Sequence, residues 1–107
     1  YHPARRAQAT LGGRWTAAWD VARAAARLLR EDFAAQRVVV FGSLTHQAWF
    51  GPASDIDLAA WGIPDDQYYR AVAAVTGISP DFEVDLVDPD SCQESLRRVI
   101  EKEGIEI

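Results

Sequence analysis

At 107 residues, the chain is long enough for one domain with a single core, and its 49% hydrophobic and 25% charged residues are ordinary for a globular domain. Its net charge of −5 argues against a domain that binds nucleic acid through the phosphates. The charge suits an acidic protein with a basic partner, and a need for solubility explains it equally well. The single Cys92 excludes an internal disulfide, no Cys/His set predicts zinc, and the lack of a membrane-length apolar run or signal peptide makes the cytoplasm the expected location.

The first third of the chain predicts a leader and then a helix. Residues 1–13 lack periodicity and end in a glycine pair, so we expect a flexible leader there and a single domain over residues 14–107. From Trp15 to about Ala35, apolar residues recur at steps of three and four, which predicts an amphipathic helix with Trp15 and Trp19 as core residues. Arg23, Arg27 and Arg30 share another face of it, which is either solvated or in contact with an acidic partner.

A buried strand and a tight turn follow the helix. Residues 38–41 are β-branched or aromatic and stop at Gly42-Ser43, which predicts a strand that runs into a turn. Residues 44–50 predict a short helix that starts at this turn and ends before Gly51-Pro52. Its free N–H groups would face a phosphate, Gly42 would allow close approach, and the Ser43 hydroxyl would either donate to the phosphate or cap the helix.

The segment from Asp55 to Trp61 predicts a strand with two acids on one face. Asp55 and Asp57 fall on one side and Ile56 on the other, which is the two-residue period of a strand. Carboxylates this close repel each other unless a cation lies between them, and Mg²⁺ prefers a few carboxylates plus substrate phosphates. The alternative is an exposed strand edge whose acids discourage aggregation.

The remaining elements complete an α/β layer architecture on a small sheet. A helix capped by Asp65 or Asp66 is expected to run to about Thr76, followed by a third strand over residues 82–87. A last helix is expected over residues 92–103, with Leu96, Val99 and Ile100 facing inward, and a strand stub at 105–107. The third strand places Glu83 and Asp85 on one face, and either could be a third carboxylate.

Taken together, these motifs resemble a known family. Gly42-Ser43, then Ser54-Asp55-Ile56-Asp57-Leu58, then Val84-Asp85-Leu86-Val87 are similar to the nucleotidyltransferase superfamily that includes polymerase β. The short chain is most similar to the minimal nucleotidyltransferase (MNT) antitoxins that accompany HEPN-domain toxins. The resemblance implies a polymerase β-like core, in which a small mixed sheet is flanked by helices.

The resemblance also implies a site and a reaction. The catalytic and metal-binding residues would be Asp55, Asp57 and Asp85, and the nucleotide-binding residues Gly42, Ser43 and Ser54. One or two Mg²⁺ ions would assist transfer of AMP from ATP to a tyrosine hydroxyl of a HEPN RNase toxin, in a hetero-oligomer with that toxin. Leu44-Thr45 stand where the family often has a basic residue, so phosphate charge would rely on Mg²⁺ and backbone amides.

Rival functions come from other classes. A non-enzymatic antitoxin would neutralise the toxin by occlusion and would tolerate the weak phosphate loop. A small-molecule nucleotidyltransferase would usually need a second domain for its acceptor, for which 107 residues leave no room. A nucleic-acid polymerase is disfavoured because the basic surface it needs is missing.

Overall fold

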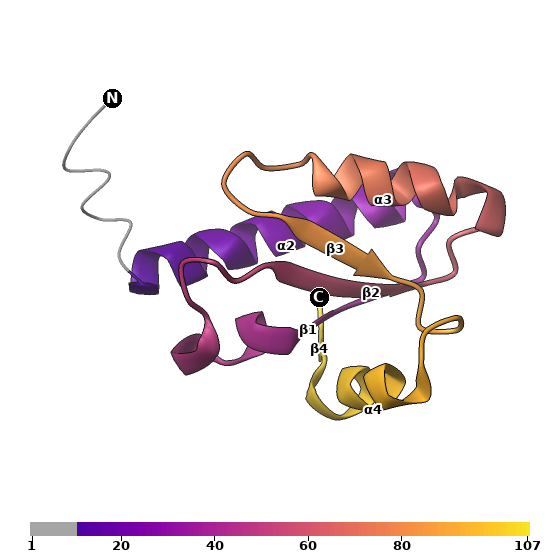
Figure 1. The fold of residues 1–107 in the computed structure, drawn as a ribbon. Helices are drawn as coiled ribbons and strands as arrows, with labels where there is room; N and C mark the ends of the chain where they lie inside the picture. The colour runs from indigo at the N-terminus through magenta and orange to yellow at the C-terminus, as the bar shows by residue number, and fades with distance from the viewer. Residues whose placement is uncertain (1–10) are drawn as a thin grey trace.

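The structure is a computed structural model that describes residues 11–107 as a mixed sheet between helices (Figure 1). Its helices are α2 (Leu11–Phe33), α3 (Tyr68–Thr76) and α4 (Glu94–Glu103), with short 3-10 turns η1 (Gly42–Thr45), η2 (Gln47–Trp49) and η3 (Asp65–Gln67). Its strands are β1 (Arg37–Phe41), β2 (Ile56–Trp61), β3 (Val84–Val87) and β4 (Ile105–Glu106). No helix within residues 11–107 has both the length and the apolar character needed to cross a bilayer.

The four strands form one sheet in the order β3-β2-β1-β4. The central strand β1 pairs antiparallel with β2 on one side and with β4 on the other. The next pair, β2 and β3, runs parallel because α3 carries the chain back to the same end of the sheet. The small mixed sheet flanked by helices, expected from the sequence resemblance, is confirmed.

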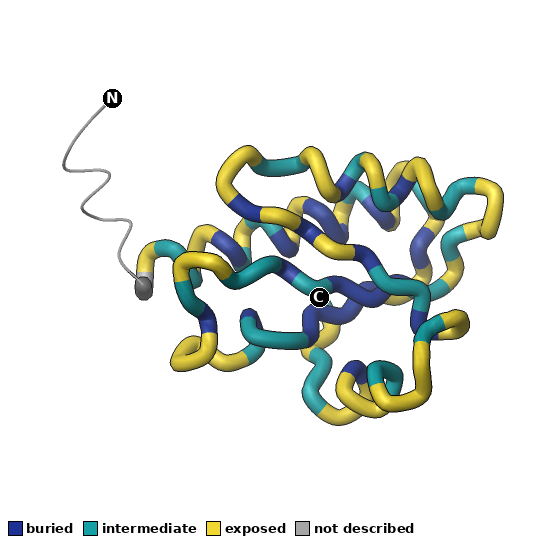
Figure 2. Tube along the Cα trace, viewed as in Figure 1, coloured by how far each residue is buried: buried dark blue, intermediate teal, exposed yellow. Residues whose placement is uncertain are grey.

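Alternation along the strands divides the core into two layers. Val38, Val40, Leu58 and Val84 face α2 and α3, where they join the larger buried cluster. The residues between them face the other way, and a smaller cluster there holds α4 against the sheet: Val39, Phe41, Ala59 and Ile100. Figure 2 shows the buried residues concentrated along the central strands and the inner faces of the helices. The helix α4 therefore covers only part of its face of the sheet.

The first helix differs from the prediction at its start. It begins at Leu11 and runs through Gly12-Gly13, which the sequence predicted as a break. Each glycine costs a helix about 1 kcal/mol relative to alanine, but tertiary contacts fasten this end. The Arg14 guanidinium donates to the Asp81 carbonyl at 3.3 Å and lies 4.4 Å from the centre of the Phe82 ring. The rest of the predicted leader, residues 1–10, lies outside the described part of the chain.

The prediction of a helix between Gly42 and Phe50 is wrong. Two short 3-10 turns stand in its place, and the extended backbone of His46 (φ −130°, ψ 107°) separates them. The Thr45 hydroxyl donates to the Gly42 carbonyl at 2.7 Å, so the side chain competes with a continued helical ladder. Burial of Leu44 and Phe50 then decides the path of the segment, since both side chains enter the core.

The remaining differences concern the ends and one face of the later helices. A 3-10 turn over Asp65–Gln67 precedes α3, and no side chain caps either element, whereas the sequence predicted an aspartate cap. The last helix begins at Glu94, two residues later than expected. Its Val99, predicted to face inward, is 37% exposed, while Ile100 is buried.

Candidate active site

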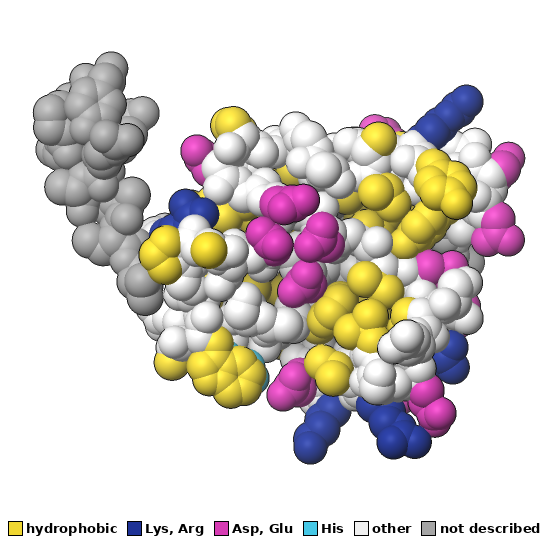
Figure 3. All heavy atoms as spheres, viewed as in Figure 1, with side chains coloured by type: hydrophobic (Ala, Val, Ile, Leu, Met, Phe, Trp, Pro, Cys, Tyr) yellow, Lys and Arg dark blue, Asp and Glu magenta, His cyan; other side chains and the backbone are white. Residues whose placement is uncertain are grey.

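Two aspartates lie side by side where the parallel strands begin. In the sheet register Asp57 of β2 is the partner of Asp85 of β3, and on its other side Asp57 is the partner of Phe41, the last residue of β1. Because side chains alternate, both carboxylates lie on the face that α4 covers at Ala59 and Val87, one pleat further along each strand. Figure 3 shows acidic side chains gathered on the surface over the start of β2 and β3.

The chain turns against the Asp57 carboxylate at Gly42. This glycine has φ +77°, a conformation that side-chain-bearing residues rarely adopt. A Cβ atom placed on it would lie 2.4 Å from Asp57 Oδ2 and 3.3 Å from Asp57 Cγ. Only a residue without a side chain therefore lets the backbone leave β1 this close to the acid. The close approach predicted at Gly42 was to a phosphate, and it stays a prediction.

The three aspartates interact electrostatically. Burial raises the pKa of Asp57 from 3.8 to about 6, with further contributions from the charges of Asp85 and then Asp55. Burial and the Asp55 charge also raise the pKa of Asp85, although its side chain is largely exposed. The neighbouring charges disfavour ionisation of Asp57 and Asp85, and a cation among the carboxylates would relieve that repulsion.

The Gly42–Thr45 turn is held in place by a hydrogen bond from α2 and by burial of Leu44. The indole Nε1 of Trp15 in α2 donates to the Leu44 carbonyl at 3.0 Å, and the Leu44 side chain is fully buried. The residue that caps the turn is Phe41, and no side chain caps it, so the alternative role of Ser43 as a cap is not met. Within residues 11–107 the Ser43 hydroxyl has no hydrogen-bond partner, and it is half-buried beside Gly42.

The structure places Ser54 in the turn that leads into Asp55. Its Oγ accepts a hydrogen bond from the Gly51 N–H at 2.9 Å, and its own N–H donates to the Gly51 carbonyl at 3.1 Å. These bonds set the start of β2, where the Ile56 N–H donates to the Glu83 carbonyl at 2.9 Å. Ser54 thus stabilises the turn that precedes β2.

Of the two candidates for a third carboxylate, the register favours Asp85. Glu83 precedes β3 and its side chain is exposed, whereas Asp85 lies directly across from Asp57. The charge of Glu83 is absent among the causes that raise the pKa of Asp57, while those of Asp85 and Asp55 are present.

Sequence reasoning missed the residues that hold the turn in place. Trp15 was expected to be only a core residue, yet its indole N–H binds the Leu44 carbonyl. Phe50 is 1% exposed and its ring lies 6.2 Å from that of Phe82, which anchors the segment between Gly42 and Asp55. The available signal for that anchor was the pair of large aromatic residues, Trp49 and Phe50, directly before Gly51-Pro52.

The donor chemistry of the aspartates fits a hard divalent cation. Mg²⁺ binds through one or two carboxylates together with substrate phosphates rather than in an all-protein cage. As the side chains stand, no three His, Cys, Asp or Glu side chains of the described residues are grouped closely enough to hold a metal ion. The fit rests on the register pair of Asp57 and Asp85 and on their mutual repulsion.

Paired carboxylates where parallel strands begin, beside a glycine turn, are the kind of donors that a cation bound together with substrate phosphates uses. Residues 24–107 match the family model described as Polymerase beta, Nucleotidyltransferase. The match covers most of the chain, so the protein belongs to the polymerase β nucleotidyltransferase family, as the motifs suggested.

Solved structures agree with this assignment. A chain of the crystal structure described as the toxin-antitoxin with AMP-PNP is 26% identical, with a TM-score of 0.61 over 76% of this chain and 67% of that one. A chain of the mutant MntA-HpeT toxin-antitoxin structure is 24% identical, with a TM-score of 0.60 over 77% and 67%, and shares the fold. The resemblance to MNT antitoxins thus finds its structural counterparts in toxin-antitoxin proteins. No curated protein matches the sequence.

Proposed function

We propose that the protein is an antitoxin that transfers AMP from ATP, with Mg²⁺, to a tyrosine hydroxyl of a HEPN-domain RNase toxin in the cytoplasm. The observation that carries the proposal is the register pair of Asp57 and Asp85, with Gly42 packed against the Asp57 carboxylate. The similarity to a toxin-antitoxin protein solved with AMP-PNP supports both the nucleotide and the partner.

In this proposal each residue has one task. Asp55 and Asp57 would hold the cation, and Gly42, Ser43 and Ser54 would border the triphosphate. When bound, Mg²⁺ supplies charge neutralisation of the phosphates and polarisation of the reacting phosphoryl group.

Asp85 would accept the proton of the attacking tyrosine hydroxyl, and its raised pKa favours that role over one as a permanent anion. The tyrosine oxygen then forms a bond to the α-phosphorus, the bond from that phosphorus to the bridging oxygen breaks, and pyrophosphate leaves with the electron pair.

The test is intact-mass spectrometry of the HEPN protein after incubation with this chain, ATP and Mg²⁺. We expect a mass gain of one or more AMP units, and none with Asp57→Asn. Asp66→Asn is the matched control, because Asp66 is an exposed acid on another part of the chain. An unmodified HEPN protein, in a stable complex with the wild type, would overturn AMP transfer and leave the antitoxin role.

One observation favours a second candidate, an antitoxin that acts by occlusion. Arg70 is the only Lys or Arg between residues 38 and 96, and Leu44 of the turn is fully buried. The segment around the site therefore supplies no cation to the phosphates. Protection of cells by Asp57→Asn that equals wild-type protection would select occlusion, whereas loss of protection with binding retained would select the enzyme.

A further inference from the structure

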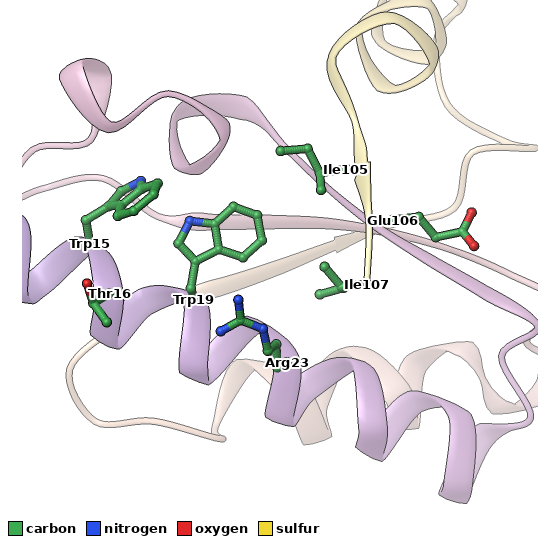
Figure 4. Close-up of a pocket in the computed structure, with 7 residues that line it drawn as sticks. All are labelled: Trp15, Thr16, Trp19, Arg23, Ile105, Glu106 and Ile107. Atoms are coloured by element: carbon green, nitrogen blue, oxygen red, sulfur yellow. The ribbon is translucent and has the colours of Figure 1, made fainter.

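A second surface lies away from the aspartates, between α2 and β4. A groove of about 590 Å³ runs there, with Trp15 and Trp19 on one side and Ile105 and Ile107 on the other. Figure 4 shows the two indole rings of α2 facing the two isoleucines across the groove. The Glu106 side chain points away from it, and Arg37 Nε donates to Glu106 Oε1 at 2.7 Å on the far side. The groove is therefore lined mainly by apolar side chains.

A row of arginines continues this groove along α2. A neighbouring hollow of about 380 Å³ is lined by Arg23, Arg27 and Arg30, and it shares Arg23 and Ile107 with the first. Arg23 lies 5.6 Å from the centre of the Trp19 ring and 3.5 Å from the Asp20 carboxylate, and Arg30 donates to the Ile107 carbonyl. Within residues 11–107, the Arg27 side chain has neither an ion pair nor a hydrogen bond. Glu31, the one acid in this hollow, leaves the row cationic.

Unsatisfied groups border the apolar part. Strand β4 is an edge of the sheet, and because Ile107 N–H donates to the Val38 carbonyl, the backbone N–H and C=O of Glu106 point away from β1. The Trp19 indole Nε1 is buried without a hydrogen-bond partner in the described part of the chain. An unpaired buried donor is unfavourable, and the backbone groups of Glu106 on the edge of the sheet remain available to a docking segment.

We infer that the groove of Trp15, Trp19, Ile105 and Ile107 with its row of Arg23, Arg27 and Arg30 docks an acidic segment with apolar side chains on the partner protein. This inference rests on the proposed function for the existence of a protein partner. Charge complementarity selects the occupant. On a chain of net charge −5, these arginines gather beside exposed apolar surface, which is the pattern that an anionic, apolar segment completes.

The same charges disfavour a second copy of this chain. In a two-fold symmetric contact the same patch meets itself, so the arginine row of one copy would lie against that of the other. Like charges placed together at an interface are unfavourable. A partner of the opposite sign has no such penalty.

The test compares binding of the HEPN protein to two charge reversals. Arg27→Glu lies in the row, and Arg70→Glu is the matched control because Arg70 is an exposed arginine on α3 without an ion pair in the described residues. We expect Arg27→Glu to weaken binding roughly tenfold and to reduce its salt dependence, and Arg70→Glu to bind as the wild type does. Equal binding of both variants would overturn the inference.

A second variant tests the apolar part. Ile105 is 42% exposed, so Ile105→Ser leaves the core intact and should weaken binding without lowering the melting temperature much. ATP binding, measured separately, should stay unchanged in these variants and change in Asp57→Asn. If the wild type binds the HEPN protein through this surface but transfers no AMP, the proposed function is overturned and the docking surface stands. If Arg27→Glu and Ile105→Ser bind the HEPN protein as the wild type does, the docking surface is overturned. Two further results would overturn the inference: binding of poly(U) RNA that only Arg27→Glu loses, or a dimer of the chain alone that Arg27→Glu disrupts.

Discussion

At the scale of single residues, the site is a compromise between charge and burial. Asp57 is partly buried on a sheet face and has two other aspartates near enough to raise its pKa to about 6. The segment that carries it, residues 38–69, contains neither Lys nor Arg. Ionisation of these carboxylates therefore destabilises the folded protein, and a bound cation would offset that cost.

Stability should depend on pH through Asp57. Its folded pKa exceeds the ordinary value of 3.8, so the folded state binds the proton more tightly than the unfolded state does. The contribution of this protonation to the free energy of unfolding is complete below about pH 4 and is lost as the pH rises through about 6. Asp57→Asn should therefore stabilise the metal-free protein at about pH 8, by on the order of 1 kcal/mol after allowance for solvent screening, and much less at about pH 4.

Urea unfolding at both pH values measures this effect, with Asp66→Asn as the exposed control. A stability difference between Asp57→Asn and the wild type that stays constant with pH would contradict the assigned pKa. Addition of Mg²⁺ to the wild type at the higher pH should recover part of the lost stability, because a bound cation favours the ionised carboxylates.

Gly42 and Gly51 provide a matched pair of substitutions. Gly42→Ala combines a positive φ with a Cβ atom 2.4 Å from Asp57 Oδ2, so we expect a loss of roughly 2 kcal/mol or more in the free energy of unfolding. A Cβ atom on Gly51 would meet nothing within 4 Å, and Gly51→Ala should change stability by less than about 0.5 kcal/mol. Equal effects of the two alanines in chemical denaturation would show that the turn is not held against the acid.

At the scale of elements, the sequence predicted the strands better than the segments between them. Alternation at Asp57, Val84 and Asp85 identified which side chains share a face, because a strand has a fixed period of two. The helix expected after Gly42-Ser43 failed because the burial of Leu44 and Phe50, a tertiary effect, decided the path there. The glycine pair in α2 failed as a break for a similar reason, since contacts of Arg14 with Asp81 and Phe82 hold that end.

The segment between the turn and β2 should depend on Phe50. Phe50→Ala removes a side chain that is 1% exposed, and a loss of about 3–5 kcal/mol is expected for truncation of a buried phenylalanine. The adjacent Trp49 is 62% exposed and stacks on His46 at 4.0 Å between ring centres, so Trp49→Ala should cost less than about 1 kcal/mol. Unfolding curves of the two variants compare them directly. A larger loss with Trp49→Ala would mean that the exposed pair, and not Phe50, anchors the segment.

At the scale of the whole molecule, the two faces of the sheet are unequally covered. The helices α2 and α3 share the larger cluster, whereas α4 rests mainly on the smaller one. The strand order that creates this inequality was beyond the sequence, because pairing of β4 with β1 depends on contacts between residues far apart in the chain. The carboxylates were nevertheless predicted to meet, since one register between β2 and β3 suffices for that.

Native-state hydrogen exchange should report this inequality. Amides of α4 should exchange through openings of lower free energy than those of β1 and β2, which lie between layers on both faces. Exchange of α4 amides only by global unfolding would contradict the two-layer description. Ile100→Ala should bring the exchange of α4 forward without changing that of α2 to the same degree, because Ile100 is its buried contact with Val39 and Phe41.

The position of β4 also has a consequence for the order of events during synthesis. Strand β1 becomes a central strand only when Ile105 and Glu106 pair with Val40 and Val39. Until Ile105 and Glu106 have left the ribosome, β1 has one unprotected edge, and such edges invite pairing with other chains. Contacts that span this much sequence also form late in folding. Pairing of Ile105 and Glu106 with β1 therefore protects that edge against contacts with other chains.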